Sequence, residues 1–534
     1  MPETHEKAGT SILIEKLQQA GCFPHPVTQI QLIETHISWV LLTGDYAYKI
    51  KKPLNLGFLD FSTLALRQRC CDEELRLNRR FAPQIYLEVV PITGDTESPQ
   101  VSGDGSAIEY TVKMRQFPQE ALASALLASG NLASSELESF AGELATIHRA
   151  AAATDAGSTF GTPSAILDAA IQNFDQLSPL LSGPDDATAM AALRAWTVAE
   201  HDARKSLMEQ RRVGGAVREG HGDLHLGNIV RIDKQLVPFD CIEFNPALRW
   251  NDVLSETAFL VMDLHDRGRP DLGWLFLNAW LDASGDHESI ALLPFYLVYR
   301  AMVRAKVHAL RARQSGVAAD ESARLMNECR RYLDLAQQFS RPPPPALIIT
   351  HGLSGSGKSQ VAAEVMQQLG AIRIRSDIER KRMHGLPSSA DTDSGVAAGI
   401  YSAGATRQLY HQLADLARKI LDAGQTVIVD ATFLQRRQRD LLRKVASACA
   451  VPFLIVSVTA SKEILCDRIR QRRVAGGDPS EADVAVLENQ LATQELLTAD
   501  ELKSTVELPS AQLTPAACCE RVIGALRARH QTNM

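Results

Sequence analysis

The chain has 534 residues, too many for one ordinary domain, and its 45% apolar and 22% charged residues exclude a disordered or fibrous protein. Its 56 basic and 63 acidic side chains leave a net charge of −7, which gives no support to a general binder of nucleic acid or anionic membranes. There is no long apolar run, no secretory signal pattern and no C-x-x-C pair among nine cysteines, so we expect a cytoplasmic protein without disulfides or structural zinc.

The region before residue 115 is predicted to contain strands. The runs SWVLL and YAYKIKK are separated by the turn-prone pair Gly44-Asp45, and IEYTVKM follows later. Beyond Arg115 the pattern becomes helical, as in ELESFAGELATIH, whose apolar residues recur at helical spacing. The sequence therefore predicts strands first and then a helical region.

Lys49 in YAYKIKK lies in the register of the V-A-I-K lysine of kinases, and Lys51 lies on the same strand face. Such a lysine needs a carboxylate from a helix, and CDEELRLNRR offers Glu73 or Glu74. We favour Glu74, because Leu77 and the residue after it follow on its side of the helix. Each charge could equally be a solvated surface residue.

The stretch HGDLHLGN, residues 221–228, matches the D-x4-N half of a kinase catalytic loop. In such a loop Asp223 would accept the proton of a substrate hydroxyl and Asn228 would help to hold Mg²⁺. Asp240 in LVPFDCIEF then occupies the place of the D-F-G carboxylate, as a second metal ligand. The alternative is an Asx-type turn followed by an ordinary hairpin.

Four consecutive prolines in RPPPP favour a stiff extended spacer, so we place a linker at residues 341–345 between domains at residues 1–340 and 346–534. Beyond it, the apolar runs ALIIT, AIRIR, TVIVD and VPFLIVSV alternate with helical patterns, one of them closed by Gly424. This alternation predicts an α/β domain with a parallel sheet covered on both faces.

A phosphate-binding loop is predicted where ALIIT is followed by GLSGSGKS and a helix. Backbone N–H groups freed by its glycines would surround phosphate oxygens, Lys358 would reach the β- and γ-phosphates, and Ser359 would hold Mg²⁺. The predicted nucleotide contacts are Gly352, Leu353, Ser354, Gly355, Ser356, Gly357, Lys358 and Ser359. The alternative is a Gly/Ser-rich turn that caps a helix.

Five further charged residues extend this prediction. Asp430 ends the strand TVIVD, where a P-loop fold places a carboxylate that supports the metal. In RSDIERKR, Asp377 would lie at the carboxyl edge of the sheet, where it could take a proton, although Ser376 and Glu379 also fit a capping box that begins a helix. The arginines of DRIRQRR, Arg468, Arg472 and Arg473, suit a lid that closes on phosphate or else a solvated basic face.

Residues 346–530 resemble the P-loop kinases of the AAA-domain group, which are similar in pattern to polynucleotide kinase, zeta toxin and small sugar kinases. The resemblance is carried by GLSGSGKS, RSDIERKR, VDATF and RIRQRR followed by GGDPSEADVAVLENQ. It implies phosphoryl transfer and gives Asp377 the role of general base. The acceptor varies widely within that group, so the resemblance names no substrate.

Residues 1–340 resemble the aminoglycoside phosphotransferase-like kinases through HGDLHLGN, FDCIEFNPALRWNDVLSETAFLVMDL and the helix with LATIH. Nearly the whole chain, including KIKKPLNLGFLDFSTL, resembles bifunctional proteins that join such a half to an ATP-binding AAA domain. The resemblance implies an α+β kinase-like fold with an N-lobe sheet at about residues 1–114, a hinge near residues 114–117 and a helical C-lobe at about residues 118–340. Two departures from protein kinases are His-Gly-Asp in place of His-Arg-Asp and the absence of G-x-G-x-x-G before Lys49.

We therefore expect an ATP-dependent phosphotransferase in which each half binds Mg²⁺ and ATP and phosphorylates a hydroxyl of a small molecule. One alternative is that one half is catalytic and the other a regulatory nucleotide-binding module. Another is that the P-loop half phosphorylates the 5′-hydroxyl of a polynucleotide, which the acidic chain disfavours. The expected partners are ATP and small hydroxyl acceptors, with no membrane.

Overall fold

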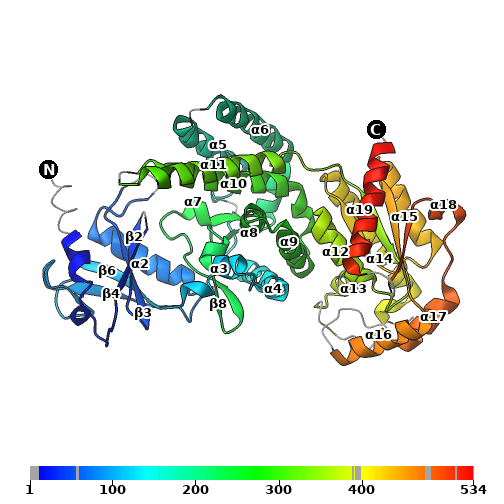
Figure 1. Ribbon diagram of the computed structural model, residues 1–534, viewed down its shortest axis with the longest axis horizontal. Helices are drawn as coiled ribbons and strands as arrows, with labels where there is room; N and C mark the ends of the chain where they lie inside the picture. The colour runs from blue at the N-terminus through cyan, green and yellow to red at the C-terminus, as the bar shows by residue number, and fades with distance from the viewer. Residues whose placement is uncertain are drawn as a thin grey trace. The chain divides into compact units, whose positions relative to one another are not determined.

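The computed structural model in Figure 1 describes residues 11–35, 37–55, 59–155, 157–181, 183–314, 316–387, 390, 399–475, 483–510 and 514–532. Its contacts divide the chain into two compact units. Unit 1 comprises Met1–Glu136, Ile147–Ala165 and Glu209–Leu260, and unit 2 comprises Leu137–Thr146, Ile166–Met208 and Val261–Met534. The predicted linker at residues 341–345 falls within unit 2, and the domain boundary placed there stays a prediction.

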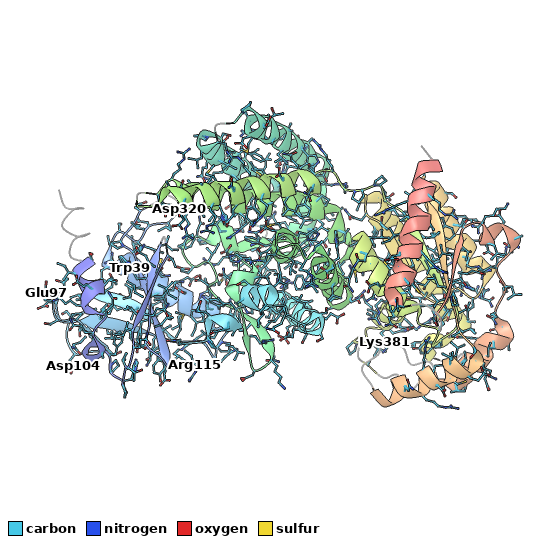
Figure 2. All side chains as sticks on the ribbon, viewed as in Figure 1. Trp39, Glu97, Asp104, Arg115, Asp320 and Lys381 are labelled. Carbon is cyan, nitrogen blue, oxygen red and sulfur yellow. The ribbon has the colours of Figure 1, made fainter. Side chains whose placement is uncertain are left out.

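Unit 1 contains a six-stranded antiparallel sheet in the order β1-β2-β3-β6-β4-β5. The strands are β1 (Gln31–Glu34), β2 (Ser38–Leu42), β3 (Tyr46–Lys51), β4 (Tyr86–Thr93), β5 (Gln100–Val101) and β6 (Glu109–Arg115). Trp39 on β2 and Arg115 at the end of β6 mark this sheet in Figure 2. The strands predicted in SWVLL, YAYKIKK and IEYTVKM are all present.

Helix α2 (Leu64–Asn78) packs on one face of this sheet and begins where Thr63 accepts a hydrogen bond from the Leu66 N–H (3.3 Å). The side chains of β3 alternate between the two faces of the sheet, and this alternation decides which of them face α2. Tyr48 and Ile50 join a core on the opposite face, whereas Ala47 joins the core that contains residues of α2. Lys49 and Lys51 therefore point to the side of α2.

The remainder of unit 1 positions the HGDLHLGN segment. It contains the short helices η1 (Ala20–Cys22), η2 (Gln119–Ala121), α3 (Ala123–Ala128), η4 (Leu226–Asn228) and α7 (Pro246–Arg249), the paired strands β7 (Val217–Glu219) and β10 (Trp250–Asp252), and the hairpin of β8 (Ile229–Ile232) with β9 (Gln235–Pro238). Asp233 and Lys234 at the hairpin turn have φ of 49° and 67°, as a two-residue I′ turn requires. Because the hairpin pairs Ile229 with Pro238, it brings the residues before β8 next to those after β9.

Helices dominate the first part of unit 2, and four of the helices contribute residues to both units. They are α4 (Ser134–Ala150), α5 (Pro163–Leu177), η3 (Ser178–Leu180), α6 (Pro184–Val213), α8 (Val253–Asp266), α9 (Pro270–Ser284), η5 (His287–Leu292), α10 (Leu293–Ala312) and α11 (Ala319–Phe339). The helix predicted in ELESFAGELATIH is α4. Within the described ranges, no helix combines the length and apolar character that crossing a membrane requires.

The C-terminal part of unit 2 is a five-stranded parallel sheet in the order β12-β13-β11-β14-β15. Its strands are β11 (Leu347–His351), β12 (Ile372–Arg375), β13 (Val427–Asp430), β14 (Phe453–Thr459) and β15 (Thr505–Pro509). The helices are α12 (Lys358–Leu369), α13 (Ser376–Met383), η6 (Gly399–Tyr401), α14 (Ala403–Asp422), α15 (Arg436–Ala448), α16 (Lys462–Ala475), α17 (Val484–Thr493), α18 (Ala499–Leu502) and α19 (Pro515–Thr532).

Helices α12 and α19 pack together, as do α14 and α15, and these pairs flank the parallel sheet (Figure 1). The predicted fold class is thus confirmed: an antiparallel sheet with helices in the N-terminal half and a parallel P-loop sheet in the C-terminal half. All nine cysteines are free.

Candidate functional site

Lys49 is the centre of the charged cluster in unit 1. Its Nζ donates to Glu74 Oε1 at 2.8 Å and also contacts Asp240 Oδ1, while its side chain is only 10% exposed. Burial opposes the charge of Lys49, but attraction from Asp240 and Glu74 outweighs it and raises the pKa well above its usual value. Glu73 points away from this cluster and pairs with Arg76 and Arg249. The structure therefore brings Lys49, Glu74 and Asp240 together.

Lys51 and Glu243 complete the cluster, and Glu243 was not predicted from the sequence. The Nζ of Lys51 contacts the second oxygen of Glu74 and a carboxylate oxygen of Glu243, and both acids are almost fully buried. Phe61 lies beneath this ammonium group, 5.5 Å from its ring centre. Lys51, two positions after Lys49 on the same strand, was the one sign in the sequence of a second buried ion pair. Its partner Glu243 could not be identified, because it lies 192 positions away in sequence.

The catalytic-loop residues lie in the same unit. The side-chain amide of Asn228 donates to the Asp223 carbonyl and to its Oδ2, both at 3.0 Å, and His225 Nε2 is 3.4 Å from that Oδ2. The Asp223 side chain is 33% exposed, so it remains open to a small molecule. Asn228 thus fixes the orientation of the carboxylate that we predict to be the base.

His221 holds the loop from within the core. Its Nε2 lies 2.8 Å from the Phe239 carbonyl and its Nδ1 lies 3.4 Å from the Asp223 N–H, which is the pattern of a neutral imidazole. Burial lowers its pKa, in agreement with that form. Gly222 has φ of 86°, and a Cβ there would lie 2.9 Å from the Leu248 carbonyl oxygen, which accounts for His-Gly-Asp at this position.

Asp240 has φ of 64°, a conformation that non-glycine residues rarely adopt. Tyr86 holds it there by accepting its N–H at 3.0 Å. Its side chain is 42% exposed, although desolvation still opposes its charge; attraction from Lys49 lowers the pKa of the carboxyl. Asp223, Asn228 and Asp240 present oxygen donors of the kind that Mg²⁺ prefers, so the residues present fit the predicted metal.

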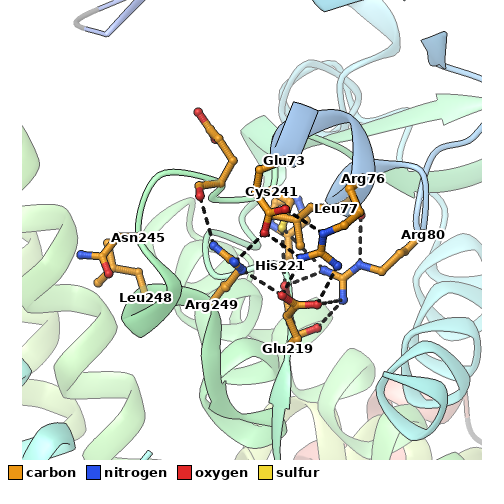
Figure 3. Close-up of polar contacts among 12 residues, drawn as sticks. Glu73, Arg76, Leu77, Arg80, Glu219, His221, Cys241, Asn245, Leu248 and Arg249 are labelled. Carbon is orange, nitrogen blue, oxygen red and sulfur yellow. Dashed lines mark hydrogen bonds and ion pairs between the residues drawn. The ribbon is translucent and has the colours of Figure 1, made fainter. Parts of the chain in front are cut away.

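Figure 3 shows a second ionic network, which joins α2 to the segments around the catalytic loop. Arg249, which is nearly buried, donates to Glu219 at 3.1 Å and to Glu73 at 2.7 Å. Arg76 donates to Glu219 at 2.8 Å, and Arg80 donates to the Glu219 carbonyl at 2.7 Å. The helix that carries Glu74 is therefore tied to β7 and α7.

The P-loop of unit 2 has the backbone that phosphate binding requires. Gly352, Gly355 and Gly357 have φ of 138°, 81° and 97°. A Cβ would lie 2.3 Å from the Val458 carbonyl oxygen at Gly352 and 2.9 Å from that of Leu465 at Gly355, so only glycine fits there. The loop therefore has the shape of an anion cradle, and its residues fit a nucleotide phosphate.

Polar side chains within the loop are turned inward. Lys358 donates to the Leu353 carbonyl at 2.7 Å and is 8% exposed, and the buried Ser356 hydroxyl has no hydrogen-bond partner among the described residues. Gln490 of α17 accepts from the Ser354 N–H (2.9 Å) and donates to the Ser354 hydroxyl (3.0 Å). Gln490 could not be assigned to the P-loop from the sequence, because its contact spans 136 positions of sequence.

Arg468 braces the loop from α16. It donates to the carbonyls of Gly355 (3.4 Å) and Ser356 (3.2 Å) and to the Ser510 hydroxyl (2.9 Å). These contacts hold the loop, while the contact with phosphate predicted for Arg468 remains a prediction. The side chains of Arg472 and Arg473 lie outside the described residues.

Two carboxylates predicted for this half lie at the carboxyl ends of neighbouring strands. Asp430 ends β13, is 5% exposed and lies 3.5 Å from the Thr350 hydroxyl of β11. Asp377 is the second residue of α13, which directly follows β12. Since β12 and β13 are paired in parallel, both residues lie at the edge where ligands of open α/β sheets bind.

The predicted capping box of Ser376 and Glu379 is wrong. Helix α13 already includes Ser376, and Arg375 at its N-cap makes no side-chain capping bond. Glu379 is buried and pairs with Arg382 one turn later and with Gln412, so its carboxylate is not available to cap the helix. The helix that this stretch was expected to begin is nevertheless present as α13.

Comparisons with known proteins identify a family model in the C-terminal half and relatives that match most of the chain. The model of the AAA domain family matches residues 347–497. An uncharacterized protein of Mycobacterium tuberculosis strain H37Rv is 30% identical over 473 residues, which cover 87% of this chain and 91% of the relative, and a protein of Mycobacterium bovis matches to the same extent. The chain belongs to the family of these mycobacterial proteins. The AAA-domain character predicted for the C-terminal half is confirmed by the first match.

Two solved structures also match this chain over part of its length. A sugar kinase from Janibacter sp. HTCC2649 is 26% identical and covers 34% of this chain and 95% of its own length, with a TM-score of 0.26. An amicoumacin kinase in complex with AMP-PNP and Ca²⁺ is 14% identical and covers 62% and 96%, with a TM-score of 0.39. The P-loop domain match supports an ATP-dependent phosphotransferase.

Proposed function

We propose that the chain is a phosphotransferase with two Mg²⁺-ATP sites, one in each unit, each serving its own small hydroxyl acceptor. The observation that carries the proposal is the contact of Lys49 with Glu74 and Asp240 next to the Asp223–Asn228 pair, in a chain that also holds a complete P-loop. A lysine held by a helix carboxylate and followed by a catalytic Asp, Asn and metal Asp is the set that phosphoryl transfer requires.

In unit 1, Asp223 takes the proton of the acceptor hydroxyl, whose oxygen forms a bond to the γ-phosphorus as the bond to the β-γ bridging oxygen breaks and ADP leaves. Asn228 keeps the Asp223 carboxylate in one orientation by donating to its Oδ2. Lys49 stays protonated and directs its charge at the phosphates, with Glu74 fixing its position. Mg²⁺, held by Asn228 and Asp240, would neutralise charge on the phosphates.

In unit 2, the N–H groups of the glycine-rich loop and Lys358 bind the phosphates, and Asp377 takes the proton from the second acceptor. Ser359 and Asp430 are the residues that would hold Mg²⁺. The breadth of acceptors among P-loop kinases, such as the sugar kinase named above, supports a small alcohol rather than a particular compound.

A search for ATP-dependent phosphorylated products in a metabolite mixture tests the proposal. We expect Asp223→Ala to abolish one set of products and Lys358→Ala another, with a loss of about a hundredfold or more in rate for each. The matched controls are Asp104→Ala and Lys503→Ala, which change exposed side chains far from both motifs in sequence. If neither Asp223→Ala nor Lys358→Ala alters any ATP turnover, the proposal is wrong.

A further inference from the structure

The outer edge of β12 is closed by a helix rather than by another strand. β12 is the strand at one edge of the parallel sheet, and Asn278 of α9 lies against it. The Asn278 amide donates to the Ala371 carbonyl at 3.0 Å and accepts from the Arg373 N–H at 2.7 Å, with the side chain 1% exposed. One side-chain amide therefore satisfies the donor and acceptor that a neighbouring strand would take.

Asp282, one turn after Asn278, faces a group of arginines. Its carboxylate lies 3.8 Å from Arg375 and 4.0 Å from Arg373, and it is 15% exposed. Arg382 donates to the carbonyls of Leu281 (3.5 Å) and Asp282 (2.5 Å) at the C-terminus of α9, where a cation is favoured. The end of α9 is thus bound to β12 and to α13, the helix that begins with Ser376 and Asp377.

A close backbone contact accompanies these polar contacts. Gly370 ends α12 with φ of 68°, and a Cβ there would lie 2.7 Å from the Trp274 ring of α9. Figure 1 shows α9 beside α12, the helix that begins at the P-loop. The contact of α9 therefore reaches both the first P-loop helix and the edge strand.

Arg373 extends the contact to the residues that we assign to Mg²⁺. It is 8% exposed, donates from Nη1 to the Ser359 carbonyl at 3.4 Å and is attracted by Asp282 and Asp430. Its Nε has no hydrogen-bond partner within the described ranges. A buried guanidinium group with this placement links Asp282 on α9 to Ser359 and Asp430 in the P-loop half.

We propose that α9 is a working part of the P-loop site, in which Asp282 holds Arg373 and Arg373 positions Ser359 for Mg²⁺. Asp282 and Arg373 are positioning residues, since they act through Ser359 rather than on the nucleotide. This inference rests on the proposed function of the P-loop half. It implies that residues before the proline segment set the metal affinity of a site whose motif lies after it.

Hydrogen exchange of the full chain, read at peptides that contain residues 352–362, tests the inference, because it reports on this site separately from the site in unit 1. ATP is held constant while Mg²⁺ is titrated, and protection of these peptides gives the half-saturating Mg²⁺ concentration. We expect Asp282→Asn to raise that concentration about tenfold, as removal of residues that orient metal ligands does, with Mg²⁺-free ATP binding unchanged. Arg373→Lys should give a smaller change in the same direction, because lysine keeps the charge but not the guanidinium fork.

The control is Asp271→Asn at the other end of α9, where the carboxylate pairs with Arg269. It should leave the half-saturating Mg²⁺ concentration unchanged. An Asp282→Asn variant whose half-saturating concentration stays within about twofold of the unmodified protein overturns the inference, because a positioning residue must affect the metal.

Failure of the proposed function would look different. In that case ATP gives no protection of residues 352–362 even in the unmodified protein. The inference is then decided by the nucleotide-free data, in which Asp282→Asn must speed exchange around Ser359 while Asp271→Asn does not. Equal exchange in the two variants overturns it.

Discussion

The partner of Lys49 could be chosen between Glu73 and Glu74 from helical spacing alone. The two acids are adjacent in sequence, and the spacing to Leu77 favours Glu74, whose carboxylate the structure places against Lys49. Lys51 and Glu243 could not be paired in this way, because their contact depends on how β3 meets the segment after β9. Spacing identifies the face of an element, whereas the partner across the core is decided by the tertiary fold.

Lys51 is predicted to contribute more to stability than its neighbour Lys52. Lys51→Met would leave Glu74 and Glu243 buried with one counter-charge fewer, so we expect the free energy of unfolding to fall by about 3 to 5 kcal/mol. Lys52→Met removes a pair whose partner Glu34 is 61% exposed and should cost less than about 1 kcal/mol. Denaturant unfolding of both variants measures the difference.

A double variant separates charge from packing. Lys51→Met combined with Glu243→Met replaces a buried ion pair by apolar side chains, and we expect it to recover part of the lost stability. Equal unfolding free energies for Lys51→Met and Lys52→Met would contradict the role assigned to the buried lysine.

Helix α2 is held in place on its far side by Arg249, in the network of Figure 3. Arg249→Ala would leave Glu219 and Glu73 with fewer counter-charges, and we expect a loss of ~3 kcal/mol in unfolding free energy and faster hydrogen exchange in α2. Arg194→Ala, which breaks an exposed pair with Asp175, is the matched control and should cost less than about 1 kcal/mol. Unchanged exchange in α2 would show that the network does not hold the helix.

His287, just beyond the C-terminus of α9, gives unit 2 a predictable pH dependence. Burial, together with Arg382, lowers the pKa of His287 to about 4, and neither ring nitrogen has a hydrogen-bond partner among the described residues. The unfolded chain takes up a proton below about pH 6.5, whereas the folded chain does so only near pH 4. The free energy of unfolding therefore falls as the pH drops through this window, by up to about 3 kcal/mol.

His287→Leu should reduce this slope, and His384→Leu, which changes an exposed histidine, should not. Chemical unfolding at several pH values between 7 and 4 provides the measurement. Parallel stability curves for the unmodified protein and His287→Leu would show that another group causes the pH dependence.

At the scale of the whole chain, the strands and the P-loop helix were predictable because each follows from local patterning and turn chemistry. The contacts that join distant segments were not, as Gln490 on Ser354 and Asn278 on β12 illustrate. An amide side chain that hydrogen-bonds to the edge of a strand or to a loop leaves no periodic signal in the sequence. Such positions become visible only when the elements are placed in space.

The full chain is predicted to bind two nucleotides. Titration calorimetry with a non-hydrolysable ATP analogue and Mg²⁺ should give a stoichiometry of about two, and Lys49→Ala and Lys358→Ala should each reduce it to about one. A stoichiometry of one that is lost in either variant alone would mean that a single site serves the whole chain.

The hydrogen bonds that the Asn278 amide makes to the edge of β12 have a consequence for fragments of this protein. A C-terminal half cut at the proline segment would lack Asn278 and Trp274, and the edge of β12 would then present unpaired N–H and C=O groups to solvent. Exposed edges of this kind recruit strands from other molecules. Self-association of that fragment would therefore reflect the loss of α9 rather than a natural oligomer, and a fragment that starts before α9 keeps the edge covered.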